Sequence, residues 1–250
     1  MKKQNAASLF GKIAVGALVV NAAWYLLAVI LRMPVLPDPL TVYAHIPEVL
    51  GDGMGIHLLA SFRRIILGLA IAMVMALIVA LGIFRWHKLG AVADAVVYFA
   101  YPVPKLALLP IVMLLAGLGD SAKVTMIVLI ILFQLIVQIR DGLRRIPKEK
   151  FLTLTSLGAS MPQMLYHLLL PSIIPDLLSG LRIAIGTAIS VLFVTETYGT
   201  DKGMGYYIVD AWMRVDYLDM YSGIVLLSLL GFSLFFLSDL IEKRFTPWRD

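Results

Sequence analysis

The chain has 250 residues, of which 60% are hydrophobic and only 15% are charged. A soluble domain usually carries about a quarter charged residues, so this composition indicates a bilayer as the solvent. There is no cysteine, which excludes disulfides, zinc–thiolate sites, iron–sulfur clusters and cysteine nucleophiles.

The first half of the chain predicts three membrane spans. Residues 13–31 are longer than the apolar part of a cleaved signal peptide, so we expect a retained span. Residues 33–64 are mixed and proline-rich, which predicts a loop with a short interfacial helix near residues 40–50. Residues 65–84 form the second span. Residues 89–118 are apolar but interrupted by three prolines, which predicts one or two discontinuous helices.

The second half predicts three more spans, at residues 123–139, 181–194 and 223–240. Residues 140–150 form the most basic loop, and residues 198–221 form a polar loop. The fold class is therefore expected to be all-α, a polytopic membrane protein with about six transmembrane helices.

The basic residues divide unevenly between the two sides if the N-terminus lies inside. The inside segments hold 13 of the 21: Lys2, Lys3, Lys12, Arg85, Lys88, Arg140, Arg144, Arg145, Lys148, Lys150, Lys243, Arg244 and Arg249. The outside segments hold six: Arg32, Arg63, Arg64, Lys123, Lys202 and Arg214. Lys105 and Arg182 are assigned to neither side. This bias predicts that both termini are cytoplasmic, although Arg63 and Arg64 go against it. It also accounts for the net charge of +5 without a nucleic-acid partner.

A polar segment rich in glycine and proline precedes the fifth span. Residues 152–157 predict one short helix, Gly158 permits a sharp turn, and residues 161–170 predict a second helix. Pro171 and Pro175 are then expected to restart the chain into the membrane. Such a helix pair has an exposed apolar edge, which either a partner covers or the lipid interface covers.

Two spans carry stripes of small residues at every fourth position, which let helix backbones approach closely. The stripes are Gly68, Ala72, Ala76 and Ala80 in the second span, and Gly180, Ala184 and Ala188 in the fifth. Two interpretations of these stripes remain open: they pack against other helices of the same subunit, or they form a dimer interface or a gate.

Polar side chains at membrane depth face a bundle interior or a water-filled path. Gln134 and Gln138 lie one turn apart on the fourth span, and Thr187 and Ser190 lie on the fifth. Helix–helix hydrogen bonds and pathway lining are the two interpretations. Glu196, at the outer end of the fifth span, is either a structural partner or part of an external gate.

The sequence contains no catalytic signature. It lacks the H-E-x-x-H, G-x-S-x-G and G-x-x-x-x-G-K-[ST] motifs, and its four histidines are scattered without metal-ligand spacing. We expect no catalytic residue, no metal site and no cofactor. Energy from a nucleotide would have to come from another chain.

Several segments resemble one known family. Leu157-Gly158-Ala159-Ser160, Leu170-Pro171 and Gly180-Leu181-Arg182 resemble the coupling loop of binding-protein-dependent ABC importer permeases, and the nitrate/sulfonate/taurine group in particular. Further pieces that match are LPDP at 36–39, SFRRIILG at 61–68, YPVPKLALLP at 101–110, GLGDSAK at 117–123 and TETYGTDKGMGYYI at 195–208. Each piece is weak alone, but the ordered set covers nearly the whole chain.

The resemblance implies a type I ABC importer permease architecture. Residues 1–250 are then one transmembrane domain, with a core bundle at residues 58–242 that contains the coupling loop at residues 151–171. It also implies two cytoplasmic ATP-binding subunits, an extracytoplasmic substrate-binding protein and a second permease copy, identical or paralogous. The chain itself would not be an enzyme. It would be a transporter subunit in a bacterial-type inner membrane, and it would couple closure of the ATPase subunits to alternating access for a small anionic or zwitterionic solute.

With this family in view, we expect particular residues to carry function. The coupling residues are expected to be Leu157, Gly158, Ala159 and Pro171. The pathway or gate residues are expected to be Gln134, Gln138, Thr187, Ser190, Glu196, Gly203 and Gly205. The two glycines are included because small residues in their loop allow the binding protein to approach closely.

One departure keeps other functions open. Leu152-Thr153-Leu154 stands where the family has Glu-Ala-Ala, and Glu149 lies three positions earlier, about one helical turn away. A non-coupling scaffold is therefore an alternative, as is an ATP-independent secondary carrier. Carriers often show two related halves, which this sequence lacks, and an enzyme would need convergent ionisable residues.

Overall fold

A computed structural model describes residues 6–246, and within that range the fold is helical without strands, which confirms the all-α prediction. The α-helices are α1 (Ala6–Leu31), α2 (Pro39–Val49), α3 (Gly55–Arg85), α4 (His87–Ala100), α5 (Leu109–Ala116), α6 (Asp120–Arg144), α7 (Lys148–Ser156), α8 (Met161–Met164), α9 (Leu170–Glu196), α10 (Met204–Met213) and α11 (Tyr217–Phe245). Shorter turns are η1 (Leu50–Met54), η2 (Lys105–Leu108) and η3 (Leu165–Leu169). Lys2, Lys3 and Arg249, which the charge bias places inside, lie outside the described residues.

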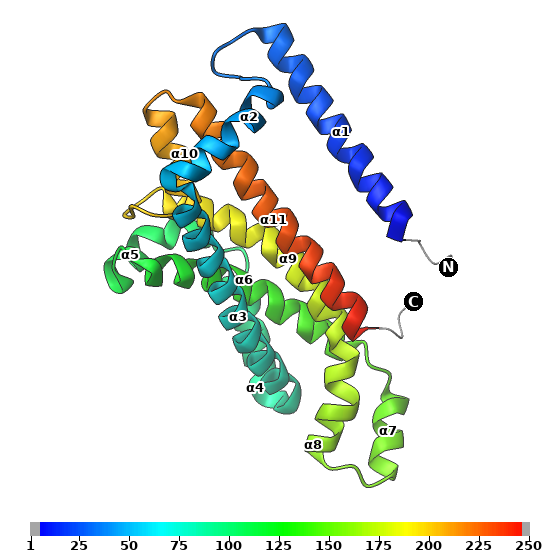
Figure 1. The fold of residues 1–250 in the computed structure, drawn as a ribbon. Helices are drawn as coiled ribbons and strands as arrows, with labels where there is room; N and C mark the ends of the chain where they lie inside the picture. Colours follow the sequence, from blue (N-terminus) through cyan, green and yellow to red (C-terminus); the bar gives the residue numbers. More distant parts are fainter. Residues whose placement is uncertain (1–5, 247–250) are drawn as a thin grey trace.

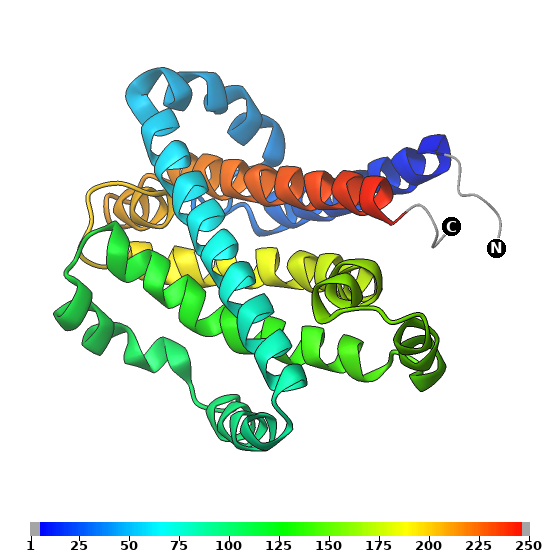
Figure 2. The same ribbon diagram turned by 90° about the horizontal axis from the view of Figure 1, so that it is seen from below.

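The centre of the bundle is formed by α3, α6 and α9, with α11 packed against α9 (Figures 1 and 2). Among the described helices, five are long and apolar enough to cross a membrane. A further pair, residues 90–100 and 105–116, passes the same test together but is bent by 85°. The prediction of about six spans, one of them broken by prolines, is therefore confirmed.

The second span begins earlier than the sequence predicts. The mixed segment holds the expected short helix, α2, but α3 already begins at Gly55, so Arg63 and Arg64 lie inside a helix and not in a loop. Asp38 caps α2, where the Thr41 hydroxyl and backbone amides hold the pKa of its carboxyl below its usual range. Gly53, with φ of 95°, bends the chain between α2 and α3.

The small-residue stripe of α3 packs inside the subunit. Gly68, Ala72, Ala76 and Ala80 are all buried. A Cβ added at Gly68 would lie 2.5 Å from Cγ2 of Ile127 on α6, so the two helix backbones are in close approach there. Between the two interpretations left open by the sequence, the structure favours packing within one subunit for this stripe.

Two further predictions are corrected by the structure. Pro171 lies in the first turn of α9, but Pro175 does not restart the chain, because it lies inside the same helix, which runs from Leu170 to Glu196. The π-helix η3 ends just before α9. At Pro171 the missing backbone N–H costs no hydrogen bond, because an N–H in the first turn of a helix has no acceptor within that helix. The polar loop at residues 198–221 also contains a helix, α10, whose inner face is buried.

Candidate functional site: a helical hairpin and an outer charge cluster

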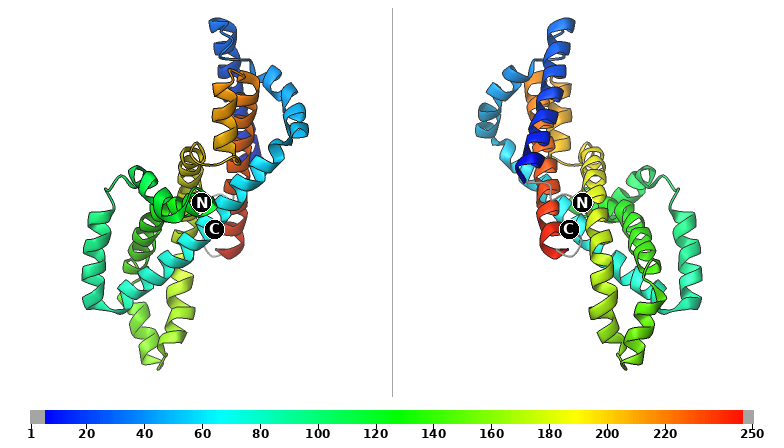
Figure 3. Two further views of the ribbon diagram at one scale, coloured as in Figure 1. Left: turned by 90° about the vertical axis from the view of Figure 1, so that its left-hand side faces the viewer. Right: turned by 90° about the vertical axis from the view of Figure 1, so that its right-hand side faces the viewer.

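A helical hairpin projects from one end of the bundle, beyond the end of α6 and the start of α9 (Figure 3). Its arms are α7 and α8, and its tip is the predicted turn at Gly158, where φ is 73°. The Gly158 amide donates to the Thr155 carbonyl over 2.9 Å, and the Ala159 amide donates to the Leu154 carbonyl over 3.0 Å. These bonds satisfy carbonyls at the end of α7, as is typical of a glycine-capped helix.

The hairpin carries exposed apolar side chains at its tip and along α7. Leu157 is 78% exposed and Leu152 is 66% exposed. The second arm begins with a capping box, in which Gln163 accepts from the backbone amide of Ser160 over 2.7 Å. The hairpin is therefore a locally capped element whose apolar edge is left without cover, a surface suited to a partner.

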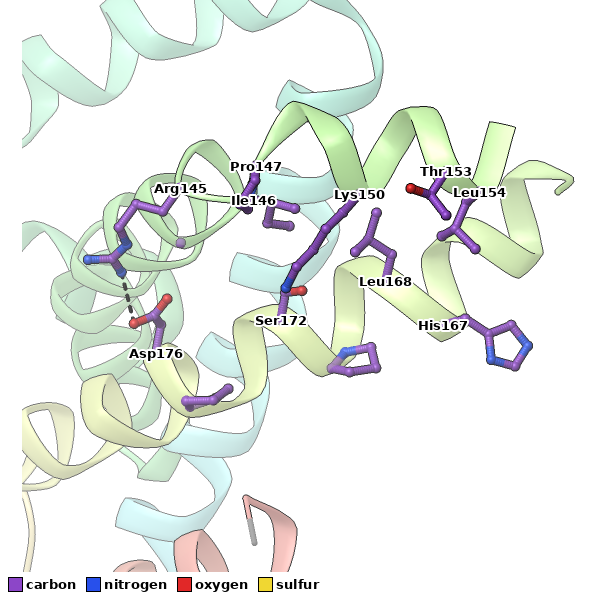
Figure 4. A pocket seen from close by; sticks show the side chains of 13 residues that line it. Arg145, Ile146, Pro147, Lys150, Thr153, Leu154, His167, Leu168, Ser172 and Asp176 are labelled. Carbon is purple, nitrogen blue, oxygen red and sulfur yellow. Dashed lines mark ion pairs between the residues drawn. The ribbon is translucent and has the colours of Figure 1, made fainter. Parts of the chain in front are cut away.

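A groove of about 710 Å³ lies between the hairpin and the start of α9 (Figure 4). Lys150 of α7 extends across it towards Ser172 of α9. At one end the guanidinium of Arg145 binds the Asp176 carboxylate over 2.8 Å. This ion pair joins the end of α6 to α9, so the base of the hairpin is fixed to two of the central helices. Pro171 lines the same groove and the exposed tip does not.

A buried charge cluster lies at the opposite end of α3, α6 and α9. The Arg64 side chain is only 4% exposed and the Glu196 side chain is 1% exposed. Arg64 Nη1 donates to Glu196 Oε1 over 2.6 Å and to the Lys202 carbonyl over 2.7 Å. Its Nε and Nη2 donate to Asp120 Oδ1 over 2.8 and 2.6 Å. The Ser61 hydroxyl lies 2.9 and 2.8 Å from the two Glu196 oxygens.

Two glycines let the loop before α10 close around Glu196. A Cβ at Gly203 would lie 2.3 Å from the Glu196 carboxylate carbon, and its φ of 128° also favours glycine. A Cβ at Gly205 would lie 2.4 Å from the Phe193 carbonyl oxygen. The Gly205 amide donates to Glu196 Oε2 over 3.0 Å, and the Met204 amide donates to the Ser61 hydroxyl over 2.8 Å. Gly203 is therefore in close contact with Glu196, and Gly205 is in close contact with both the Phe193 carbonyl and Glu196.

Comparison with known proteins identifies the family that has this architecture. Residues 65–247 match the family described as the binding-protein-dependent transport system inner membrane component. The chain belongs to this permease family. Membership implies an ATPase partner and a substrate-binding partner, and it makes the chain a multi-pass protein of the inner membrane.

The permease is similar to several curated transport proteins. It is 29% identical to the taurine transport system permease protein TauC of Escherichia coli (strain K12), over 77% of this chain and 70% of that one. It is 28% identical to the formylaminopyrimidine transport permease protein ThiX of Halalkalibacterium halodurans, over 93% of each. It is 29% identical to the nitrate import permease protein NrtB of Synechococcus elongatus, over 76% of this chain and 72% of that one.

A solved structure supports the fold independently. The permease matches a chain of the inward-facing MetNI methionine ABC transporter with a TM-score of 0.65 and 21% identity, covering 79% of this chain and 96% of that chain. This match shows the fold, and the family and its transport-permease relatives identify the chain as a transmembrane subunit of the ABC importer type, as the sequence predicted.

The pathway residues expected from the sequence lie in different surroundings. Gln134 lines a cavity beside the bend between α4 and η2. Gln138 instead lies against Gly180, where an added Cβ would be 2.6 Å from its side-chain oxygen. Thr187 and Ser190 donate to carbonyls of their own helix. The structure therefore does not gather these four polar groups in one place.

Sequence reasoning missed most of the outer cluster. It identified Glu196 but not the partners that reach it from other helices, Ser61 and Arg64 of α3. It also counted Lys123 among the basic residues on the outside, whereas that side chain is fully buried and donates to the Leu118 carbonyl over 2.6 Å. The one available signal was the Arg63-Arg64 pair that contradicts the charge bias.

Proposed function

We propose that this permease is the membrane subunit of an ATP-driven importer for a small anionic or zwitterionic solute, such as nitrate, taurine or a related sulfonate. The similarity to a taurine transport permease, TauC, and a nitrate import permease, NrtB, supports this substrate class. ATP hydrolysis is assigned to two separate cytoplasmic ATP-binding subunits, because the sequence has no phosphate-loop motif. An extracytoplasmic binding protein delivers the solute, and a second permease copy, identical or paralogous, completes the pathway.

The projecting hairpin is the observation that carries this proposal. It extends past the spans, its tip is capped by a glycine turn, and its apolar edge is exposed. We assign Leu157, Gly158 and Ala159 to the surface that docks in the ATPase, and Pro171 to the junction with α9. Closure of the ATPases would then be transmitted through the Arg145–Asp176 end of the groove to α6 and α9.

The orientation follows from the charges at the two ends. The hairpin end carries basic residues of the α6–α7 region, and the opposite end carries most of the acidic residues. The positive-inside bias therefore favours a cytoplasmic hairpin and cytoplasmic N- and C-termini. We treat residues 1–250 as one permease domain whose core bundle is residues 58–242.

We assign the outer gate to the charge cluster. The loop before α10 contacts α9 through Glu196, Gly203 and Gly205. A conformational change in this loop would therefore move a central helix directly. Gln134, Gln138, Thr187 and Ser190 are proposed to face the pathway during the transport cycle. The binding protein would act on this end of the molecule.

The missing acidic residue of the coupling loop leaves two alternatives for the experiment to decide. Glu149, in the first turn of α7 and exposed, is the proposed substitute for the contact that Leu152-Thr153-Leu154 cannot make. If it does not substitute, the chain is a non-coupling scaffold, and if transport needs no ATP, it is a secondary carrier.

The test is reconstitution of the permease with its candidate ATPase and binding protein in liposomes. Gly158→Pro removes the amide that binds Thr155 and fixes φ near −65°, so it should abolish stimulated ATP hydrolysis. Gly51→Ala is the control, because an added Cβ there meets nothing within 4 Å. No complex with the ATPase, or hydrolysis that is indifferent to Gly158→Pro, would overturn the proposal.

A further inference from the structure

A lysine lies at the bend of the broken span, beside the middle of α6. Lys105 is the first residue of η2, and the cavity beside it includes Phe133 and Gln134 of α6. These two residues lie 13 and 14 positions after Asp120, near the midpoint of a helix of 25 residues. Ionisable groups at this depth are costly to bury and usually serve function.

The described residues give the Lys105 ammonium only neutral partners. Its Nζ donates to the Ala100 carbonyl over 2.8 Å and to the Tyr101 carbonyl over 3.0 Å. It lies 4.8 Å from the ring centroid of Phe133 and 5.8 Å from that of Tyr101. An ammonium has three donors, so two carbonyl bonds leave one for a further acceptor.

The neighbouring cavity has a suitable size and lining for a small solute. Its volume is about 410 Å³, within the range of about 300–1,000 Å³ that is common for ligand pockets. Gln134 supplies a polar amide, whereas Leu106, Ile130 and Val191 supply apolar walls. A positive charge, one amide and apolar walls together suit an anionic head group that carries a small organic part.

We propose that Lys105 and Gln134 form a binding site within the permease for a small monoanion with oxygen acceptors, such as a sulfonate. The inference deepens the proposed function and rests on it, since it places a site for the solute along the membrane path. Lys105 supplies the counter-charge, and the carbonyls at the end of α4 hold its ammonium in place.

A purely structural role for Lys105 is the competing explanation. A cation near the C-terminal end of a helix is favourable without any ligand, and Lys105 follows the end of α4. The two roles differ in one respect: only a binding site responds to the charge of an added solute. The test therefore compares methanesulfonate with dimethyl sulfone, an uncharged molecule of similar shape.

The absence of cysteine in this chain permits a site-specific test. Val103→Cys places a single thiol on the cavity and leaves both Lys105 and Gln134 intact. The permease–ATPase complex is treated with N-ethylmaleimide, an uncharged thiol reagent, and labelling is measured on the permease band. Methanesulfonate should slow labelling about tenfold at about ten times its dissociation constant, by simple competition. Dimethyl sulfone should have no effect.

Two substitutions at Lys105 decide the assignment. Lys105→Gln in the Val103→Cys background should abolish protection by methanesulfonate, and Lys105→Arg should retain it. The ratio of rates with and without the anion is compared within each variant, because Lys105 also affects the reactivity of a nearby thiol. Leu106→Cys, on the same cavity, provides a second thiol position if the first variant does not assemble.

The outcomes separate this inference from the proposed function. Equal labelling with and without methanesulfonate, or protection that survives Lys105→Gln, overturns the site even when wild-type complexes show ATP-driven uptake. Protection that depends on Lys105 supports the site even when uptake needs no ATP, in which case the ATP-driven mechanism is what fails.

Discussion

The guanidinium of Arg64 binds the carboxylate of Glu196 over 2.6 Å at a point where both side chains are almost fully buried. Their helices, α3 and α9, are far apart in the sequence, and Asp120 brings α6 to the same guanidinium. All three central helices therefore meet at one charged group. Loss of one partner would leave a buried charge without compensation, which is more costly than loss of the contact itself.

Arg64→Met should lower the free energy of unfolding by about 3–5 kcal/mol, the range for breaking a buried ion pair from one side. Arg63→Met is the matched control, because Arg63 is 64% exposed and pairs with the same Asp120. A surface pair contributes about 0–1 kcal/mol. Thermal unfolding in detergent, followed by helical circular dichroism, measures the difference, and equal losses in the two variants would contradict the prediction.

A double-mutant cycle tests whether Arg64 and Glu196 act together. Once Arg64→Met has removed the cation, Glu196→Gln should cost less than it does in the wild type, because residues in one network are not additive. The measurement is the same thermal unfolding for the two single variants and the double variant. Strictly additive losses would show that the two side chains stabilise the fold independently.

Gly203→Ala should destabilise the outer end of the permease more than Gly117→Ala. Both glycines have positive φ, so each substitution carries a backbone cost of about 1–2 kcal/mol. Only at Gly203 would the new Cβ also collide with Glu196, since nothing lies within 4 Å at Gly117. Limited proteolysis of the loop before α10, compared in the two variants, should detect the difference, and equal cleavage rates would argue against it.

The sequence predicted the parts of the fold that depend on local pattern. Apolar runs located the spans, and Gly158 located the turn of the hairpin, because a glycine between two short helices has one local explanation. The mixed, proline-rich composition of residues 33–64 predicts a loop that includes Arg63 and Arg64. Their partners, Asp120 and Glu196, lie far along the chain, so no local pattern reveals that the charges are compensated.

The same limit applies to the functional residues. Glu196 was found as an isolated acid at a span end, but its role as the centre of a cluster depends on Ser61 and Gly205, which only the folded chain brings together. Lys105 was assigned to neither side of the membrane because its depth depends on the 85° bend of its span. Three prolines predict that a helix is interrupted but not the angle of the break.

Gly68→Ala should destabilise the bundle, whereas Gly82→Ala on the same helix should be neutral or stabilising. Replacing a helical glycine by alanine gains up to about 1 kcal/mol in helix propensity. At Gly82 the nearest side-chain atom is 3.7 Å from the added Cβ, but at Gly68 the Ile127 side chain is 2.5 Å away. Thermal unfolding of the two variants measures this difference in stability. Combining Gly68→Ala with Ile127→Ala should recover part of the stability lost to the clash. If the double variant recovers no stability, the clash with Ile127 is not the cause of the loss.

Leu157→Asp should separate docking from folding. Leu157 is 78% exposed at the tip of the hairpin, and exposed substitutions usually change stability by less than about 0.5 kcal/mol. A charge in an apolar docking surface should nevertheless weaken association, because it must be desolvated without a partner. Leu40→Asp is the control, since Leu40 is 67% exposed on α2 at the opposite end of the molecule. Co-purification with the ATPase should fall for Leu157→Asp alone, while the unfolding temperatures of both variants stay close to that of the wild type. Equal loss of ATPase from both variants would show that the hairpin tip is not the docking surface.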